Sequence, residues 1–404
     1  MNLGIMPAAG PRTDDPNSKG RIALIVVFSG IAATLLLMAP AVAGQLFRQM
    51  GLTPTQTGDL FAVELGAMSL ASLPALLWIK RANLRAAATL CGSVFVAGNL
   101  LSGFLDSYGA LVTVRGITSF AGGSLMVLAM ALAAQTRNRD RVYGLWSVGQ
   151  LTFGAIGLAV LPAFFETVGI SVVYWTLAAA MLLALPLVRF LPAGRNVSSS
   201  LAEGTPEKPN VGKSILGLIA CLIFYIGLSG IWTFTGGIAA ASAIDPATSG
   251  LILSAATLVG ILGSTVATLV GGRASRRFLL MGGYLGMIVA VALFFGTPDA
   301  LRFAGAALLF KFTWPWTLPF LMSTLADLDR AGRATNLANL FIGGGFAIGP
   351  FIAGRLIESE GGYSALVITS SIALVVSLVL VQLAQPKKVP APEPEAHAVS
   401  PVDA

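Results

Sequence analysis

The chain has 404 residues, of which 55% are hydrophobic and only 11% are charged. Soluble domains carry about 25% charged residues, so this composition excludes a water-soluble globular protein. The net charge of +7 does not indicate nucleic-acid binding, because the basic residues stand in short clusters between apolar runs. The sequence therefore predicts a protein whose surroundings are the lipid bilayer, with no nucleic-acid partner.

Apolar runs near the length that crosses a bilayer, about 20 helical residues, recur along the whole chain. The predicted spans are 22–47, 56–79, 85–104, 108–135, 142–165, 169–190, 214–240, 247–271, 277–297, 300–325, 334–356 and 362–384. Residues 1–20 are polar and show no cleavable signal peptide. We therefore expect an all-α polytopic membrane protein with twelve transmembrane helices and both termini on one side.

Basic residues indicate which side that is. Of the 25 lysines and arginines, 20 lie near the termini or in the even-numbered loops, three lie in odd-numbered loops and two lie inside spans. Arg48, Arg302 and Arg355 are the three on the opposite side. Positive charge is retained on the cytoplasmic side, so we expect both termini in the cytoplasm of a bacterium and the spans in its inner (plasma) membrane.

The chain divides into two halves of six spans. A polar cytoplasmic N-terminal segment (1–20) precedes the first half (21–190), a polar linker (191–213) leads to the second half (214–384), and a Pro- and Ala-rich tail (385–404) is expected to be disordered. An offset of 192 residues pairs matching residues of the two halves. These pairs include Arg81 with Arg273, Arg85 with Arg277, Gly58 with Gly250 and Glu166 with Glu358. Two parallel repeats are a transporter plan, with the substrate site between them near the midplane.

Two short basic loops now suggest a family. Residues 80–85 read KRANLR between spans 2 and 3, and residues 272–277 read GRASRR between spans 8 and 9. Both resemble the D-R-x-G-R-R loop of the major facilitator superfamily, with its acidic residue and glycine replaced. Span 4 adds Arg115 followed by small residues, and span 11 has Gly345, Gly349 and Pro350. The resemblance covers about residues 20–385 and implies a secondary transporter, which we expect to be a monomer.

Three ionisable residues lie inside predicted spans: Glu64 in span 2, Arg115 in span 4 and Lys311 in span 10. Charge in hydrocarbon is costly, so such residues indicate a functional site. Two cations against one carboxylate would attract an anion such as a carboxylate, and Glu64 would carry the coupling proton. A structural Glu64–Arg115 ion pair, and a packing or snorkelling role for Lys311, are the alternatives.

Aromatic and polar residues accompany these charges. We expect Gln45, Tyr225, Trp232, Trp314 and Trp316 to line the substrate site with Arg115 and Lys311. Pro315 and Pro319 free backbone carbonyls in span 10, as in the broken helices that line transporter sites. The alternative for the tryptophans is packing or an interfacial belt.

Arg81, Arg85, Arg273 and Arg277 are predicted to gate the two halves, the alternative being that these loops only set topology. The many glycines allow close helix packing, which also suits halves that rock.

The sequence thus predicts a secondary active transporter, a proton-coupled symporter of a small organic anion, with no enzymatic activity, cofactor or metal. The 46 glycines include no phosphate-binding Gly-Lys loop, so ATP-driven transport is not expected. A proton-antiport exporter of drugs or metabolites is the alternative. Span 5 lacks the proline that follows glycine in such exporters, which counts against it. A membrane-embedded enzyme or a lipid flippase is the alternative from a different functional class.

Overall fold

The computed structural model describes residues 15–79, 81–191, 211–271, 273–328 and 333–385, and every regular element in these ranges is helical. The helices are α1 (Lys19–Leu37), α2 (Ala39–Met50), α3 (Pro54–Leu70), α4 (Ser72–Trp78), α5 (Leu84–Ser102), α6 (Tyr108–Ala133), α7 (Arg139–Val160), η1 (Leu161–Phe164), α8 (Ser171–Ala184), η2 (Leu185–Phe190), α9 (Val211–Ala241), α10 (Pro246–Val270), α11 (Arg276–Ala292), α12 (Ala300–Leu328), α13 (Arg333–Glu358) and α14 (Gly362–Ala384).

The predicted fold class, an all-α polytopic membrane protein of twelve spans, is confirmed. Within the described ranges, nine helices are each long and apolar enough to cross a membrane. The predicted spans 1 and 2 are each built from a helix pair, α1 with α2 and α3 with α4. Of the other spans, α11 is short at 17 residues, and the apolar run of α12 is interrupted by Lys311, two tryptophans and two prolines.

Prolines explain why spans 1 and 2 are interrupted, although the sequence predicted each as one segment. Pro40 and Pro74 each lie just after a break, at Met38 and at Ala71 respectively. A proline has no N–H to donate to the carbonyl four residues earlier and its ring crowds that carbonyl. The regular hydrogen-bond ladder therefore stops at these points.

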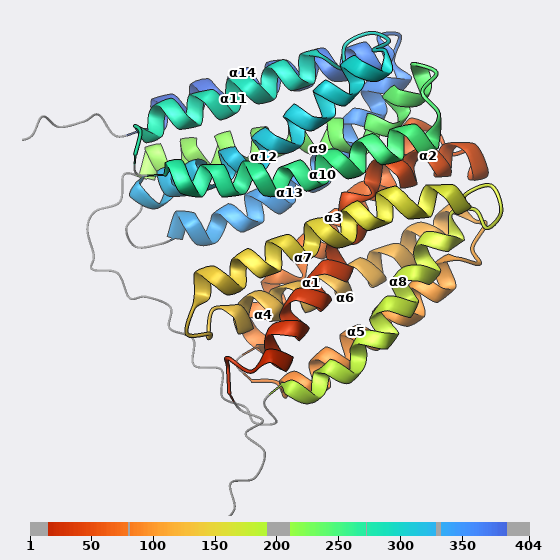
Figure 1. Cartoon of the computed structure of the whole chain (residues 1–404), viewed down its shortest axis with the longest axis vertical. Helices are drawn as coiled ribbons and strands as arrows, with labels where there is room; N and C mark the ends of the chain where they lie inside the picture. The colour runs from red at the N-terminus through yellow and green to blue at the C-terminus, as the bar shows by residue number, and fades with distance from the viewer. Residues whose placement is uncertain (1–14, 80, 192–210, 272, 329–332, 386–404) are drawn as a thin grey trace, which may run out of the picture.

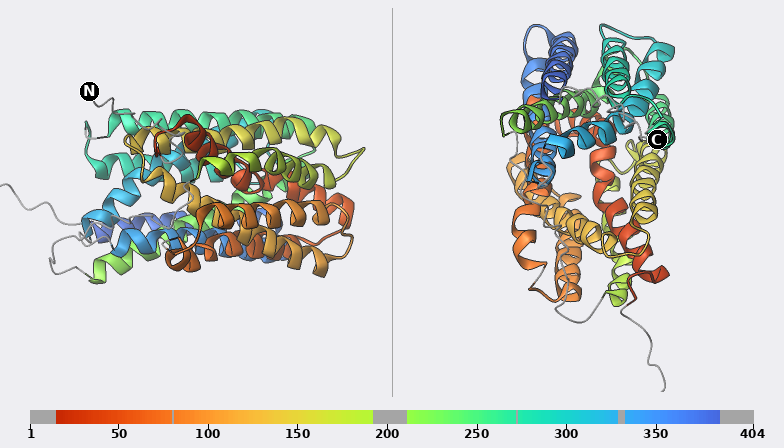
Figure 2. Two further views of the ribbon diagram at one scale, coloured as in Figure 1. Left: turned by 90° about the horizontal axis from the view of Figure 1, so that it is seen from below. Right: turned by 90° about the vertical axis from the view of Figure 1, so that its left-hand side faces the viewer.

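The helices form two groups that lie on either side of the molecule (Figures 1 and 2). Helices α1 to α8 form the N-terminal half and α9 to α14 the C-terminal half. Across the boundary α3 packs against α13, α7 against α10, and α2 against α9. Three of these helices, α3, α9 and α13, carry residues of the site described below.

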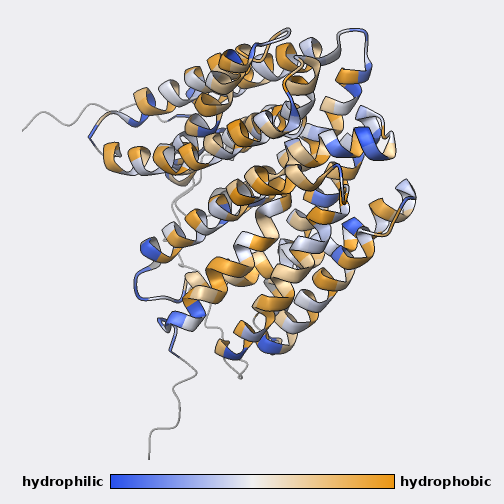
Figure 3. Ribbon diagram, turned by 45° about the vertical axis from the view of Figure 1, so that its right-hand side comes forward, coloured by the Kyte–Doolittle hydropathy of each residue, from blue (hydrophilic) through white to orange (hydrophobic). Residues whose placement is uncertain are grey.

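Hydropathy is distributed as a bilayer requires (Figure 3). Hydrophobic residues run along the helices and hydrophilic residues gather at the helix ends and loops. Large apolar side chains point outward, and Leu183 and Leu301 are each more than 80% exposed. Such a surface is stable in lipid and unstable in water.

The bundle has two ends, which we name by the segments they carry. The terminal face carries Lys19, the turn at 134–138 and Ala384; the distal face carries the loops at 51–53, 242–245 and 359–361. Close approaches between the halves occur on the distal side, where a Cβ on Gly236 would meet the Pro40 carbonyl and one on Gly58 would meet the Pro350 carbonyl, and also toward the other end of α3, where a Cβ on Gly343 would meet the Ser69 side chain. Glycine permits this contact because backbone can pack directly on backbone.

Several predicted features fall outside the described residues. Residues 1–14, most of the linker (192–210) and the tail (386–404) are not described. At their edges the structure differs from the prediction, because α1 begins at Lys19 and α9 at Val211, both a few residues before the predicted spans.

Candidate functional site

Lys311 lies in α12, near the middle of the 29-residue helix, with a side chain that is almost completely buried. Its ammonium nitrogen lies 3.8 Å from the ring centroid of Trp232 on α9 and 4.6 Å from that of Trp314 on α12. An ammonium held over an indole face is stabilised by the ring quadrupole, by about 2 kcal/mol when desolvated. Two indoles therefore hold this cation, and among the described residues none forms an ion pair with it.

Aromatic rings continue outward from this cation. Trp232 stacks on Phe310 with centroids 6.1 Å apart and an interplanar angle of 9°. Trp314 contacts Phe346 on α13, and Phe346 contacts Tyr225 on α9 at 5.0 Å. We call Lys311, Trp232, Trp314, Phe310, Phe346 and Tyr225 the Lys311 site. It combines one positive charge with flat apolar walls.

The backbone beneath Lys311 is also irregular. Pro315 removes the N–H that would bond to the Lys311 carbonyl. That carbonyl faces Gly260 of α10, where an added Cβ would lie 3.2 Å from the oxygen. The proline and the glycine together let α10 and α12 pack closely just behind the cation, which fixes its position in the C-terminal half.

Glu64 and Arg115 form a closed cluster inside the N-terminal half. The Nε of Arg115 lies 2.5 Å from Oε1 of Glu64, and its Nη1 donates to the side-chain oxygen of Asn99 at 2.8 Å. The guanidinium also lies over the ring of Tyr174, 4.8 Å from its centroid. Both charged side chains are buried. The pair is therefore neutral as a unit, and the structural ion pair that the sequence left open is present.

A small cavity of about 20 Å³ adjoins this pair and is lined by Leu36, Met68, Ser119 and other residues of the N-terminal half. Ser119 is the residue that the 192-residue offset pairs with Lys311. The repeat thus places a hydroxyl in one half where the other half has an ammonium. The charges of Glu64 and Arg115 cancel each other. Of the three charged residues Glu64, Arg115 and Lys311, only Lys311 therefore contributes a net charge.

Asn99 and Tyr174 were missed by sequence analysis. Each is a single polar group in an apolar run. Which way it faces depends on the rotation of α5 and α8, which spacing alone does not give.

The structure places Gln45 and Trp316 away from the Lys311 site. Gln45 donates to Gln49 and to the Phe165 carbonyl, both in the N-terminal half. Trp316 donates to the Leu279 carbonyl of α11 and stacks on Phe312. Trp316 lies five positions, about 500° of helical rotation, beyond Lys311, and so points toward a different neighbour.

The basic loops make contacts within their own halves. Arg85 donates to the carbonyls of Leu191 and Arg189 at the end of the sixth span, and Arg277 donates to Gln382 at the end of the twelfth. Arg81 and Arg273 lie exposed in the turns before α5 and α11. The two loops thus make equivalent contacts in the two repeats, each fastening a loop to the last helix of its half.

Among the described residues, the ion pair that joins the two halves lies at the distal face. Asp59 on α3 pairs with Arg355 on α13 at 2.7 Å. Glu358, at the end of α13, accepts from the backbone N–H of Thr55 at 3.0 Å and from its hydroxyl at 2.7 Å. A carboxylate at a helix N-terminus satisfies unpaired N–H groups and faces the positive end of the helix dipole. Glu358 therefore caps α3 from the other half.

Locking this distal contact should stop transport. We expect Thr55→Cys with Glu358→Cys, in a Cys91→Ser/Cys221→Ala background, to lose uptake on oxidation and regain it with a reductant. The reason is that the halves must separate here to open the distal side. Uptake into proteoliposomes is the measurement. The control pair, Arg276→Cys with Asp327→Cys, replaces an ion pair inside one half; oxidised control protein should transport normally, and an active oxidised Thr55/Glu358 pair would contradict the expectation.

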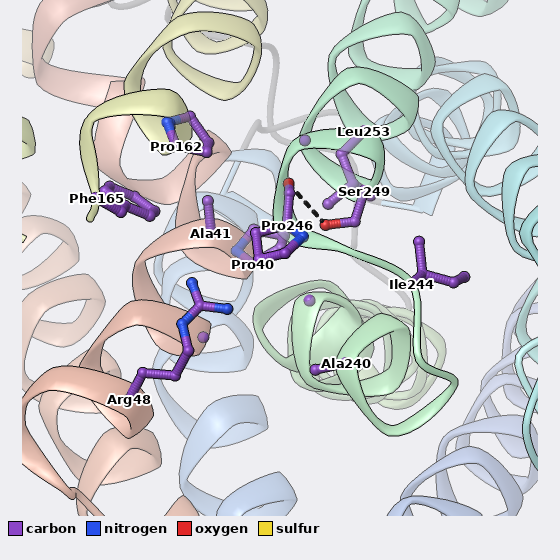
Figure 4. Close-up of a pocket in the computed structure, with 13 residues that line it drawn as sticks. Pro40, Ala41, Arg48, Pro162, Phe165, Ala240, Ile244, Pro246, Ser249 and Leu253 are labelled. Carbon is purple, nitrogen blue, oxygen red and sulfur yellow. Dashed lines mark hydrogen bonds between the residues drawn. The ribbon is translucent and has the colours of Figure 1, made fainter. Parts of the chain in front are cut away.

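A cavity of about 30 Å³ lies between the halves at the distal face (Figure 4). Pro40, Arg48 and Phe165 line it from the N-terminal half, and Pro246 and Ser249 from the C-terminal half. Such a volume holds about one or two water molecules. An organic solute does not fit there, so the distal path is closed in this conformation.

Comparison with known proteins gives one family and one fold. A family model described as Major Facilitator Superfamily matches residues 22–217 and again residues 217–403. The chain is similar to the crystal structure of nucleoside transporter NupG, with a TM-score of 0.67, 14% identity, and coverage of 91% of this chain and 98% of that one. A mutant of NupG gives a TM-score of 0.69 at 14% identity, covering 90% and 98%. No curated protein matches the sequence.

Proposed function

Because this chain belongs to the major facilitator superfamily and is therefore a multi-pass membrane transporter, we propose that it moves a small organic anion, such as a carboxylate, by alternating access. Lys311 binds the anionic group, and Trp232, Trp314 and Tyr225 enclose the rest of the solute. The observation that carries this proposal is the buried ammonium of Lys311, which lies beside two indoles and forms no ion pair with a carboxylate of the described residues. A desolvated cation without a counter-ion is costly, and binding an anion removes that cost.

The aromatic rings of the Lys311 site narrow the class of solute that we propose for it. The walls of the Lys311 site are flat aromatic rings, whereas a sugar is bound largely through hydrogen bonds to its hydroxyl groups. A carboxylate joined to a planar or apolar body satisfies both the charge and the walls. Arg115 is held by Glu64 and Asn99, and it acts on the solute only if that pair separates.

Glu64 is the proposed coupling group. It is a buried carboxylate whose partner is a single arginine, and Leu36 beside its cavity also contacts Trp232. Protonation of Glu64 would free Arg115 and change the charge balance near the interface between the halves. We place the protein in the bacterial inner membrane with the terminal face in the cytoplasm, on the strength of the basic residues at that face.

Lipophilic drugs and nucleosides are the two alternatives to an organic anion as the solute. The alternative role is proton-antiport export of drugs or metabolites, and aromatic walls also accept lipophilic drugs. NupG is described as a nucleoside transporter, and a nucleobase is flat enough for the same walls. A neutral or cationic solute, however, leaves the Lys311 ammonium without a counter-ion.

A thermal-shift screen of the purified protein tests the proposal. The panel pairs aromatic and aliphatic monocarboxylic acids with their neutral amides, and adds nucleosides and cationic drugs. A ligand at 100 times its Kd stabilises the folded state by about 2.7 kcal/mol, so the acids that bind should raise the melting temperature while their amides do not. Stabilisation by nucleosides or cationic drugs and by none of the acids would refute the anion proposal.

A further inference from the structure

The break in the first span leaves a backbone carbonyl short of its helical donor. Leu36 lies four residues before Pro40, so the N–H that would bond to its carbonyl oxygen is missing. The nearest backbone donor is the N–H of Met38, which is shared with the Thr34 carbonyl. A carbonyl in this position needs another donor, because buried unpaired polar groups are destabilising.

That donor comes from the other half of the protein. The indole N–H of Trp232 on α9 donates to the Leu36 carbonyl at 3.1 Å. One turn further along α9, Gly236 packs on the Pro40 carbonyl so closely that a Cβ would overlap it, and Phe234 stacks on Phe47 of α2 at 6.1 Å. The α9 helix therefore contacts the first span through these three residues, and two of the contacts, at Leu36 and Pro40, lie directly beside the break.

The same indole also faces Lys311. Its edge bonds to the N-terminal half, and its face lies 3.8 Å from the Lys311 ammonium in the C-terminal half. Trp314 offers a second face to the same ammonium, but its ring contacts Phe346, within the C-terminal half. Of the two indoles at the cation, Trp232 is the one that bridges the halves.

We propose that Trp232 is a positioning residue that couples the Lys311 site to closure of the distal face, its N–H holding the halves together through the Leu36 carbonyl. Opening the distal side moves α9 away from α1 and α2 and breaks this bond. A solute anion that draws the ammonium off the indole face changes the position of the ring, and with it the bond. The closure part of this proposal is independent of the solute; only the ligand-driven part rests on the proposed function.

Trp232→Phe removes the indole N–H that bonds to Leu36 but keeps an aromatic face toward Lys311. The substitution therefore separates these two roles of Trp232. We expect Trp232→Phe to open the distal side more often. The reporter is Ser249→Cys, in a Cys91→Ser/Cys221→Ala background, because Ser249 is buried and lines the cavity between the halves at the distal face. One neutral hydrogen bond corresponds to about a threefold to tenfold change in an equilibrium, so labelling by a membrane-impermeant maleimide should accelerate by about that factor.

Three controls make the result specific. Trp314→Phe removes a similar indole from the same ammonium and should leave the labelling rate within about twofold. Thr167→Cys, in an exposed distal turn, reports probe reactivity and should be unchanged in all variants. Pro40→Ala returns an N–H to Leu36, so adding Trp232→Phe to Pro40→Ala should accelerate labelling less than Trp232→Phe does alone.

The proposal is overturned if Trp232→Phe leaves the labelling rate unchanged, or if Trp314→Phe raises it equally. Labelling needs no solute, so its outcome is separate from that of the anion proposal. An accelerated rate in a protein that binds no acid would support the contact between Trp232 and Leu36 and count against the anion.

Discussion

Replacing Lys311 with glutamine should reduce uptake of the bound acid by about 10-fold to 150-fold, because a hydrogen bond to a charged group contributes about 1.5–3 kcal/mol. Glutamine keeps much of the length of the lysine side chain and removes its charge. Lys311→Arg keeps the charge and should retain part of the activity, since the guanidinium also binds over indole faces. Initial rates of uptake into proteoliposomes, at matched protein content, measure the effect.

The matched control lies on the same helix. Arg302 is an exposed cation at the distal end of α12 that bonds to the Phe295 carbonyl. Arg302→Gln removes the same charge without touching the Lys311 site and should transport at a rate close to that of the wild type. Equal losses in Lys311→Gln and Arg302→Gln would mean that overall charge, and not a specific site, controls transport.

The buried pair should show the largest stability effect. Arg115→Gln leaves the Glu64 carboxylate buried without its partner, and breaking such a pair costs about 3–5 kcal/mol. Glu64→Gln combined with Arg115→Gln removes both charges, so we expect it to recover most of that loss. The free energy of unfolding in mixed micelles is the measurement.

An exposed pair provides the comparison. Arg276 and Asp327 lie at the terminal face with side chains about half exposed, and breaking such a pair costs about 0–1 kcal/mol. Arg276→Gln should therefore change the free energy of unfolding far less than Arg115→Gln. If the two single variants lose the same stability, the Glu64–Arg115 pair is not the buried element described here.

The double variant also tests proton coupling. If Glu64 carries the proton, Glu64→Gln with Arg115→Gln should exchange solute across the membrane in counterflow but no longer respond to an imposed pH gradient. Uptake that still follows the gradient would place the coupling proton elsewhere.

Much of the architecture follows from the sequence because hydrophobic length and the positions of arginines are local features. The spans, the two repeats and the placement of Lys311 inside a span required no knowledge of which side chains contact one another. The breaks at Met38 and Ala71 were missed, although Pro40 and Pro74 mark both, because a proline does not say whether a span bends or is interrupted.

Side-chain partners were predictable only in part. An ion pair between Glu64 and Arg115 was one of the two interpretations that the sequence left open, since both residues are charged and each is costly alone in lipid. It gave no sign that Glu358 caps α3, a contact between residues 303 positions apart, nor that Trp232 bonds to Leu36. Such contacts depend on how the halves are docked. Arg85 and Arg277, predicted to gate the two halves, bond within their own halves in this structure, and their gating role stays a prediction.

The central claim is that Lys311 binds the anionic group of the solute. Its most direct test compares the binding of a carboxylic acid that stabilises the protein with the binding of the neutral amide of that acid. Isothermal titration of the wild type should show at least about tenfold tighter binding of the acid, and in Lys311→Gln this preference should disappear while the amide binds as before. If Lys311→Gln still prefers the acid to the same degree, then Lys311 does not bind the anion and the account of the site is wrong.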